Sequence, residues 1–123
     1  MMAEPKDPAE LALVVKAISL AQNTRGCCEW NERAARRIRQ QPPCQGMTPE
    51  GIRESLLDHV NDKGGQVIQV EEKREEYREH RFYYKAIIPV AGLGRGLFVE
   101  IVLADDDPDF PAVEIVNAHE QGR

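Results

Sequence analysis

Two runs rich in β-branched and aromatic residues near the C-terminal end constrain the fold of this chain more than any other feature. Residues 82–90 read FYYKAIIPV and residues 97–104 read LFVEIVLA. Six residues, three of them glycine, join the two runs. This pattern predicts a β-hairpin, and the rest of the chain is expected to pack against it.

Three segments before the hairpin have the spacing of helices. Asp7-Pro8 and Thr48-Pro49 each place a capping side chain before a proline, which is typical of a helix start. They predict helices that run to about Asn23 and to the glycines at 64 and 65. Between them, residues 30–41 predict a short basic helix that stops at a pair of prolines.

The strands predict an antiparallel sheet. Runs at 67–70 and 112–118 resemble two further strands. The polar segment 71–80 is predicted to carry strands into both of its ends with a turn near Glu75-Glu76, and a mobile loop or a short polar helix are the alternatives. Because the connections between the four strands are short, we expect an antiparallel meander with the N-terminal helices on one face, an α+β fold. A chain of 123 residues fits one domain. The period of two leaves Lys85 and Phe98 on the open face.

Composition excludes several classes of protein. The net charge of −5 does not fit a general polyanion binder, although residues 25–41 carry five arginines against two glutamates. Three cysteines without a CxxC pair argue against a structural zinc site and fit a reducing, cytoplasmic location. No stretch is long and apolar enough for a membrane span, and no metal or cofactor site is expected.

A layout of short motifs resembles small ribonuclease-type domains. These motifs are Arg33-Ala34-x-x-Arg37 on the basic helix, the helix start at Thr48, and the final strand that ends in Asn117-Ala118-His119. The resemblance covers about residues 28–120, and is to the superfamily of barnase, EndoU, the tRNA-cutting colicins and the RelE-like toxins. It implies an RNA-cleaving or RNA-binding toxin-like domain that needs no metal, with RNA lying across the open face of the sheet. A protein that neutralises the toxin would be a further partner.

The resemblance also implies roles for individual residues. The strand cation and hydroxyl would be Lys85 and Tyr84, and the other proton carriers would be His119 and His80. The residues expected to bind RNA phosphates are Arg33, Arg37, Arg81 and Arg95. Arg33 stands where the family has a histidine. Strict alternation along the last strand places His119 on the helix-packed side, opposite Lys85, unless a bulge redirects it.

The alternative function is a non-enzymatic interaction domain. The open face is expected to be unusually apolar, which is typical of a surface that binds a partner or a second copy of the chain. A nuclease requires at least two of His80, Lys85, Arg95 and His119 to converge within about hydrogen-bond range of one phosphate. An interaction domain would leave them scattered, so whether the chain is an enzyme stays open at this point.

Overall fold

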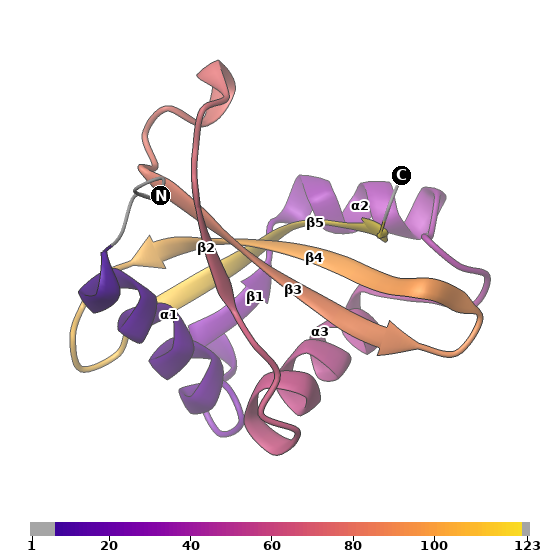
Figure 1. Ribbon diagram of the computed structural model, residues 1–123, viewed down its shortest axis with the longest axis horizontal. Coiled ribbons are helices and arrows are strands. Elements are labelled where there is room, and N and C mark those ends of the chain that lie inside the picture. Colours follow the sequence, from indigo (N-terminus) through magenta and orange to yellow (C-terminus); the bar gives the residue numbers. More distant parts are fainter. Residues whose placement is uncertain (1–6, 122–123) are drawn as a thin grey trace, which may run out of the picture.

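Residues 7–121, the part of the chain that the computed structural model describes, form three α-helices and a five-stranded sheet (Figure 1). The predicted α+β class is confirmed. The helices are α1 (Pro8–Leu20), α2 (Glu32–Gln40) and α3 (Pro49–Leu57), and the strands are β1 (Cys28–Trp30), β2 (Ile68–Glu71), β3 (Phe82–Val90), β4 (Leu93–Asp105) and β5 (Ala112–Glu120).

The sheet is mixed, so the prediction of four antiparallel strands is wrong in its detail. The order is β1-β5-β4-β3-β2, in which the last four strands in sequence form the predicted antiparallel meander and β1 pairs parallel with β5. The sequence does not reveal β1 because three residues are too few to show an alternating pattern. Trp30 therefore belongs to a strand, and the basic helix begins two residues later than predicted.

Side-chain caps set the start of each helix. Asp7 Oδ1 accepts a hydrogen bond from the Glu10 amide at 3.1 Å, and Thr48 Oγ1 accepts one from the Gly51 amide at 3.0 Å, which confirms both predicted starts. Asn31 caps α2 in the same way. These bonds satisfy backbone donors that have no partner inside the helix.

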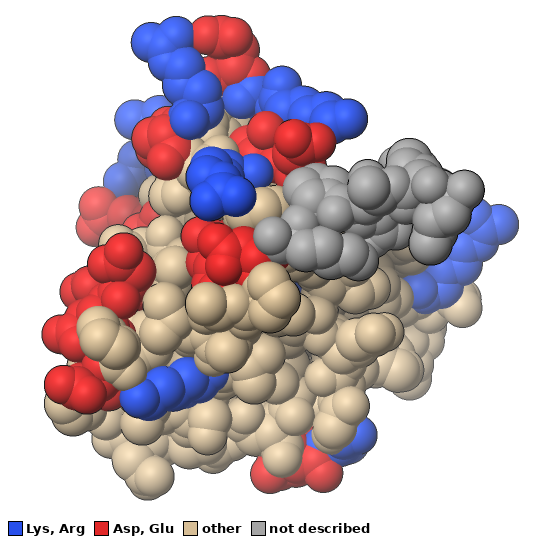
Figure 2. Space-filling model, turned by 60° about the vertical axis from the view of Figure 1, so that its left-hand side comes forward, with Lys and Arg blue, Asp and Glu red and all other residues tan. Residues whose placement is uncertain are grey.

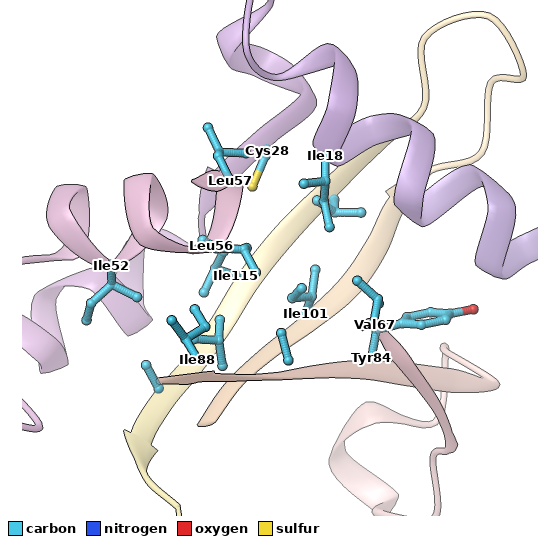
Figure 3. Packing of buried hydrophobic residues seen from close by; sticks show 14 of the residues in the cluster. Ile18, Cys28, Ile52, Leu56, Leu57, Val67, Tyr84, Ile88, Ile101 and Ile115 are labelled. Atoms are coloured by element: carbon cyan, nitrogen blue, oxygen red, sulfur yellow. The ribbon is translucent and has the colours of Figure 1, made fainter. Parts of the chain in front are cut away.

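Helices α1 and α3 pack on one face of the sheet and close the core (Figure 3). Ile18 of α1 and Leu56 of α3 are fully buried against Tyr84, Ile101 and Ile115 of the central strands. Helix α2 is placed differently. It continues from β1 and lies beside the C-terminal half of β5 (Figure 1), and only its Ile38 joins the main core.

A bulge in β5 decides which way its last residues face. Ile115 pairs with Ile101, but Asn117 pairs with Glu100, so Val116 is an extra residue in β5. An extra residue reverses the alternation beyond it. His119 thus lies opposite Phe98 on the open face, not on the helix-packed side that strict alternation predicts.

The predicted hairpin is confirmed, but its connection is shorter than six residues. Strands β3 and β4 are joined by Ala91-Gly92, and the other glycines belong to an irregular start of β4. Gly96 has a φ of +84°, and a Cβ atom there would lie 2.8 Å from the carbonyl oxygen of Ile88. Glycine is required at this position because any side chain would be strained and would collide with β3.

The segment between β2 and β3 contains a 3₁₀ turn at Glu75–Tyr77 and projects beyond the sheet (Figure 1). Positive and negative side chains alternate over it, as the top of Figure 2 shows. The turn lies near Glu75-Glu76 as predicted, but β2 ends at Glu71 and β3 begins at Phe82, so the prediction that strands extend into both ends of residues 71–80 is wrong.

Candidate functional site

The face of the sheet opposite α1 and α3 carries polar, aromatic and charged side chains together. The pairings of β3 with β4 and of β4 with β5 align these residues across three strands. They are Tyr83, Lys85 and Ile87 from β3, Phe98, Glu100 and Val102 from β4, and Asn117 and His119 from β5. We call this set the open face.

His119 stacks on Phe98 at the hairpin end of the open face. The two ring centroids are 4.6 Å apart and the rings are inclined by 18°. His119 Nδ1 lies 2.9 Å from the carbonyl oxygen of Glu120. Since a carbonyl oxygen can only accept a hydrogen bond, Nδ1 carries the proton and Nε2 is the nitrogen left for a substrate.

Arg74 links the projecting segment to the middle of the open face. Its guanidinium pairs with Glu72 at 2.8 Å and also with Glu100, and lies over the rings of Tyr77 and Tyr83. The Glu72 and Glu100 side chains are only 1% and 5% exposed. The hydrogen bonds from Arg74 lower the pKa of Glu72, so this pair is ionised at neutral pH. Glu100 is thus a nearly buried acidic side chain that is paired with Arg74.

Lys85 lies on the open face between β2 and β4, where it pairs across the strands with Ile68 and Glu100. Tyr84, the residue before it, points into the core on the opposite side and is fully buried. The structure thus brings Lys85 and His119 to one face but does not bring Tyr84 to either of them.

The Tyr84 hydroxyl belongs to a buried polar network. It donates to Glu10 Oε1 at 2.5 Å and accepts from Gln69 Nε2 at 2.9 Å. Gln69 also bonds both backbone groups of Asp7. The network ties the start of α1 to β2 and β3. Burial, and then the hydrogen bond to Glu10, raise the pKa of the Tyr84 phenol.

Tyr84→Phe is expected to lower the free energy of unfolding by about 1–2 kcal/mol at neutral pH, because the network loses two hydrogen bonds. A raised phenol pKa contributes stability that is lost as pH rises above about 10, where the unfolded chain ionises. Urea unfolding at pH 7 and at about pH 10.5 checks both points. Wild type should lose more stability between the two pH values than Tyr84→Phe, and equal losses would contradict this account.

His80 and Arg81 lie before β3, at the other end of that strand from its hairpin. His80 is 3.8 Å from Glu79, and Arg81 is 3.6 Å from Asp7 and stacks over Phe82. The hollow beside them also contains carboxylates of Glu10, Asp105 and Asp106. A second hollow beside them contains both cations and carboxylates of the projecting segment. Neither hollow contains Lys85 or His119, so the structure does not join the two residues to them.

Ion pairing divides the cations of residues 7–121 into two groups. Arg25, Arg53, Arg74, Arg78 and Arg81, with Lys63 and Lys73, each have a carboxylate within 4.0 Å. In this part of the chain, seven cations have no carboxylate within that distance. One of them, Lys16, donates to the carbonyl oxygen of Pro108 in the loop between β4 and β5. The other six are Arg33, Arg36, Arg37, Arg39, Arg95 and Lys85. We call these six the unpaired cations.

Five of the six unpaired cations lie near one end of the molecule, and the sixth, Lys85, lies within β3 on the open face. Four lie on α2, beside the C-terminal half of β5, where Arg37 donates to the carbonyl oxygen of Val116 at 3.2 Å. Arg95 lies in the start of β4 near the hairpin turn, on the same side of Figure 1 as α2. The acidic loop between β4 and β5 lies at the opposite side of that view. The electrostatic attraction for an anion is thus concentrated near α2, the hairpin and His119.

Comparisons with protein families, curated proteins and solved structures gave no match for this chain. Among residues 7–121, no helix is long and apolar enough to cross a membrane. No group of three or more histidines, cysteines or acidic residues in that range is arranged to hold a metal ion. The site is therefore interpreted from its own geometry.

Glu100 and Arg74 are not among the site residues predicted from the sequence. Glu100 is the only charged residue in the apolar run 97–104. A charged side chain in such a run is expected to be buried, and a buried charge needs a specific partner. This signal could have pointed to Glu100. Arg74 gives no such signal because it lies in a segment where charges of both signs alternate. Its partner, Glu100, is 26 residues away.

Proposed function

We propose that this chain binds single-stranded RNA across the open face and cleaves it with its own side chains as proton carriers, as a toxin-like ribonuclease does. The observation that carries the proposal is the position of the unpaired cations. The net charge of −5 is consistent with it, since acidic side chains pair with the other arginines of residues 7–121 and with two of the lysines in that range.

Aromatic side chains on the same face support single-stranded RNA rather than a duplex. Proteins recognise unpaired bases by stacking them on aromatic rings of a sheet surface and by neutralising the phosphates between them. Phe98 with His119 and Tyr83 with Arg74 supply two such ring systems on adjacent strands. Lys85 lies between them and would bind the phosphate.

Cleavage requires two proton carriers and a cation. The 2′-oxygen forms a bond to phosphorus, the bond from phosphorus to the 5′-oxygen breaks, and the products are a 2′,3′-cyclic phosphate and a 5′-hydroxyl. In our proposal Glu100 accepts the proton of the 2′-hydroxyl, and His119, protonated on both ring nitrogens, donates its Nε2 proton to the leaving oxygen. Lys85 stabilises the negative charge that develops on the phosphate. RNA would have to displace Arg74 from Glu100 for this step.

The test uses a short fluorescent single-stranded RNA with wild type and Lys85→Ala. Binding measured by anisotropy should weaken about fivefold to tenfold in the variant. The slope of the logarithm of the binding constant against the logarithm of the salt concentration should become shallower by about the value for one phosphate contact. Lys63→Ala is the matched control, because Lys63 is 70% exposed and pairs with Asp58 away from the open face. Wild-type cleavage should persist in EDTA and yield a cyclic phosphate.

The outcomes separate the two functions that the sequence leaves open. If wild type does not bind RNA at low salt, or if Lys85→Ala and Lys63→Ala behave alike, the proposal fails. A chain that forms a dimer through the open face and ignores RNA would instead be an interaction domain. Analytical ultracentrifugation of wild type and Phe98→Glu detects that dimer, since a charge in the interface would dissociate it.

A further inference from the structure

We propose that a groove between β2 and β3 is a nucleobase subsite of the same RNA site, and that it gives the protein a preference among bases. This inference rests on the proposed function. The groove would hold the base next to the phosphate that Lys85 binds. It would thus decide which RNA sequences are placed for cleavage.

The groove has a volume of about 650 Å³ and lies beside the open face. Cross-strand pairing places Ile68 next to Lys85 and Val70 next to Tyr83, so these four side chains are neighbours in one wall. Lys73 and Arg74 lie at the end of the groove where β2 passes into the projecting segment, and each is paired with a glutamate of the same lining, Glu71 and Glu72. The volume is within the range of pockets that bind small ligands.

The lining suits a planar ring that is attached to an anion. Ile68, which is 36% exposed, and Val70 offer apolar surface, and Tyr83 offers an aromatic ring. Lys85 belongs both to the groove and to the open face, and it has no carboxylate partner. A phosphate at Lys85 would therefore place the attached nucleotide at the entrance of the groove.

The backbone of β2 supplies groups that can distinguish bases. Strand β2 is the last in the sheet, so among residues 7–121 no strand pairs with its outer edge. The backbone N–H and C=O groups on that edge are donors and acceptors at fixed positions. Bases differ in the donors and acceptors along their edges, so such an array binds some bases better than others. An extended peptide could also pair with this edge, but the cation shared with the open face favours a nucleotide.

Val70→Trp tests the subsite because the larger side chain fills the groove. Anisotropy titrations with short oligo(A), oligo(C) and oligo(U) should show that wild type prefers one base by at least about fivefold. The variant should bind all three with similar affinity. Val15→Trp is the matched control, because Val15 is a 40% exposed valine on α1, on the other face of the sheet. Ile68→Trp serves as a second filling variant if Val70→Trp does not fold.

A second measurement locates the base directly. RNA that contains 5-iodouridine, crosslinked by light and digested, should attach to the peptide that carries Tyr83 in wild type and not in the filled variant. If both filled variants keep the wild-type preferences, or if crosslinks map only to the Phe98 or His119 peptides, the subsite is wrong although RNA binding stands. If an added extended peptide, and no RNA, protects the Tyr83 region from digestion, the groove binds protein. If wild type binds no RNA, the proposed function itself fails.

Discussion

Arg53→Ala is expected to lower the free energy of unfolding by about 3–5 kcal/mol. Arg53 is only 3% exposed, although it carries a positive charge. Its Nε donates to the carbonyl oxygen of Cys28 at 2.7 Å and its Nη2 to that of Ala21 at 3.4 Å. The side chain thereby joins α3 to β1 and to the end of α1. Alanine would leave a cavity and two buried carbonyl oxygens without these donors.

Urea unfolding followed by circular dichroism measures this loss. Arg53→Met keeps much of the volume but none of the donors, so it should recover only part of the stability. Arg25→Ala is the control, because Arg25 makes two hydrogen bonds to Glu50 but its side chain is 57% exposed. Exposed ion pairs contribute little to the free energy of unfolding. If Arg53→Ala and Arg25→Ala were equally stable, the buried hydrogen bonds of Arg53 would not be important for the fold.

The hairpin and two of the helix starts could be predicted because their signals are local. Residues 82–90 alternate between the core and the open face over nine positions, and this alternation is confirmed by burial of Phe82, Tyr84 and Ile88. The caps at Asp7 and Thr48 need only the next few residues to form. Where a pattern is long or a motif is self-contained, the sequence determines the local structure.

The features that shape the site depend on distant pairings. The bulge at Val116 turns His119 towards Phe98, and nothing in residues 112–118 marks it. Strand β1 forms only because β5 lies beside it. Ion pairing is equally hidden, since Arg74 and Glu100 are 26 residues apart and Arg25 and Glu50 are 25 apart. The net charge alone therefore suggests a surface unsuited to RNA. The ion pairs change this picture, because they neutralise other cations and leave a cationic region near α2 and the hairpin.

His119→Phe is expected to reduce RNA cleavage by about 10² to 10⁴-fold while RNA affinity changes less than about twofold. Phenylalanine preserves the flat ring that stacks on Phe98, so the stacking surface for a base remains. It removes Nε2, the group that would protonate the leaving 5′-oxygen. Single-turnover cleavage and anisotropy on the same RNA separate the two effects, and circular dichroism verifies the fold.

Phe98→Leu gives the opposite pattern and completes the argument. Leucine removes the ring beneath His119 but leaves the imidazole in the chain, so affinity should fall by about tenfold. Cleavage at saturating protein should fall less than in His119→Phe. If His119→Phe cleaves as fast as wild type, His119 is not the proton donor, and the chemistry has to be assigned to other groups of the open face. If both variants lose only affinity, the open face binds RNA without cleaving it.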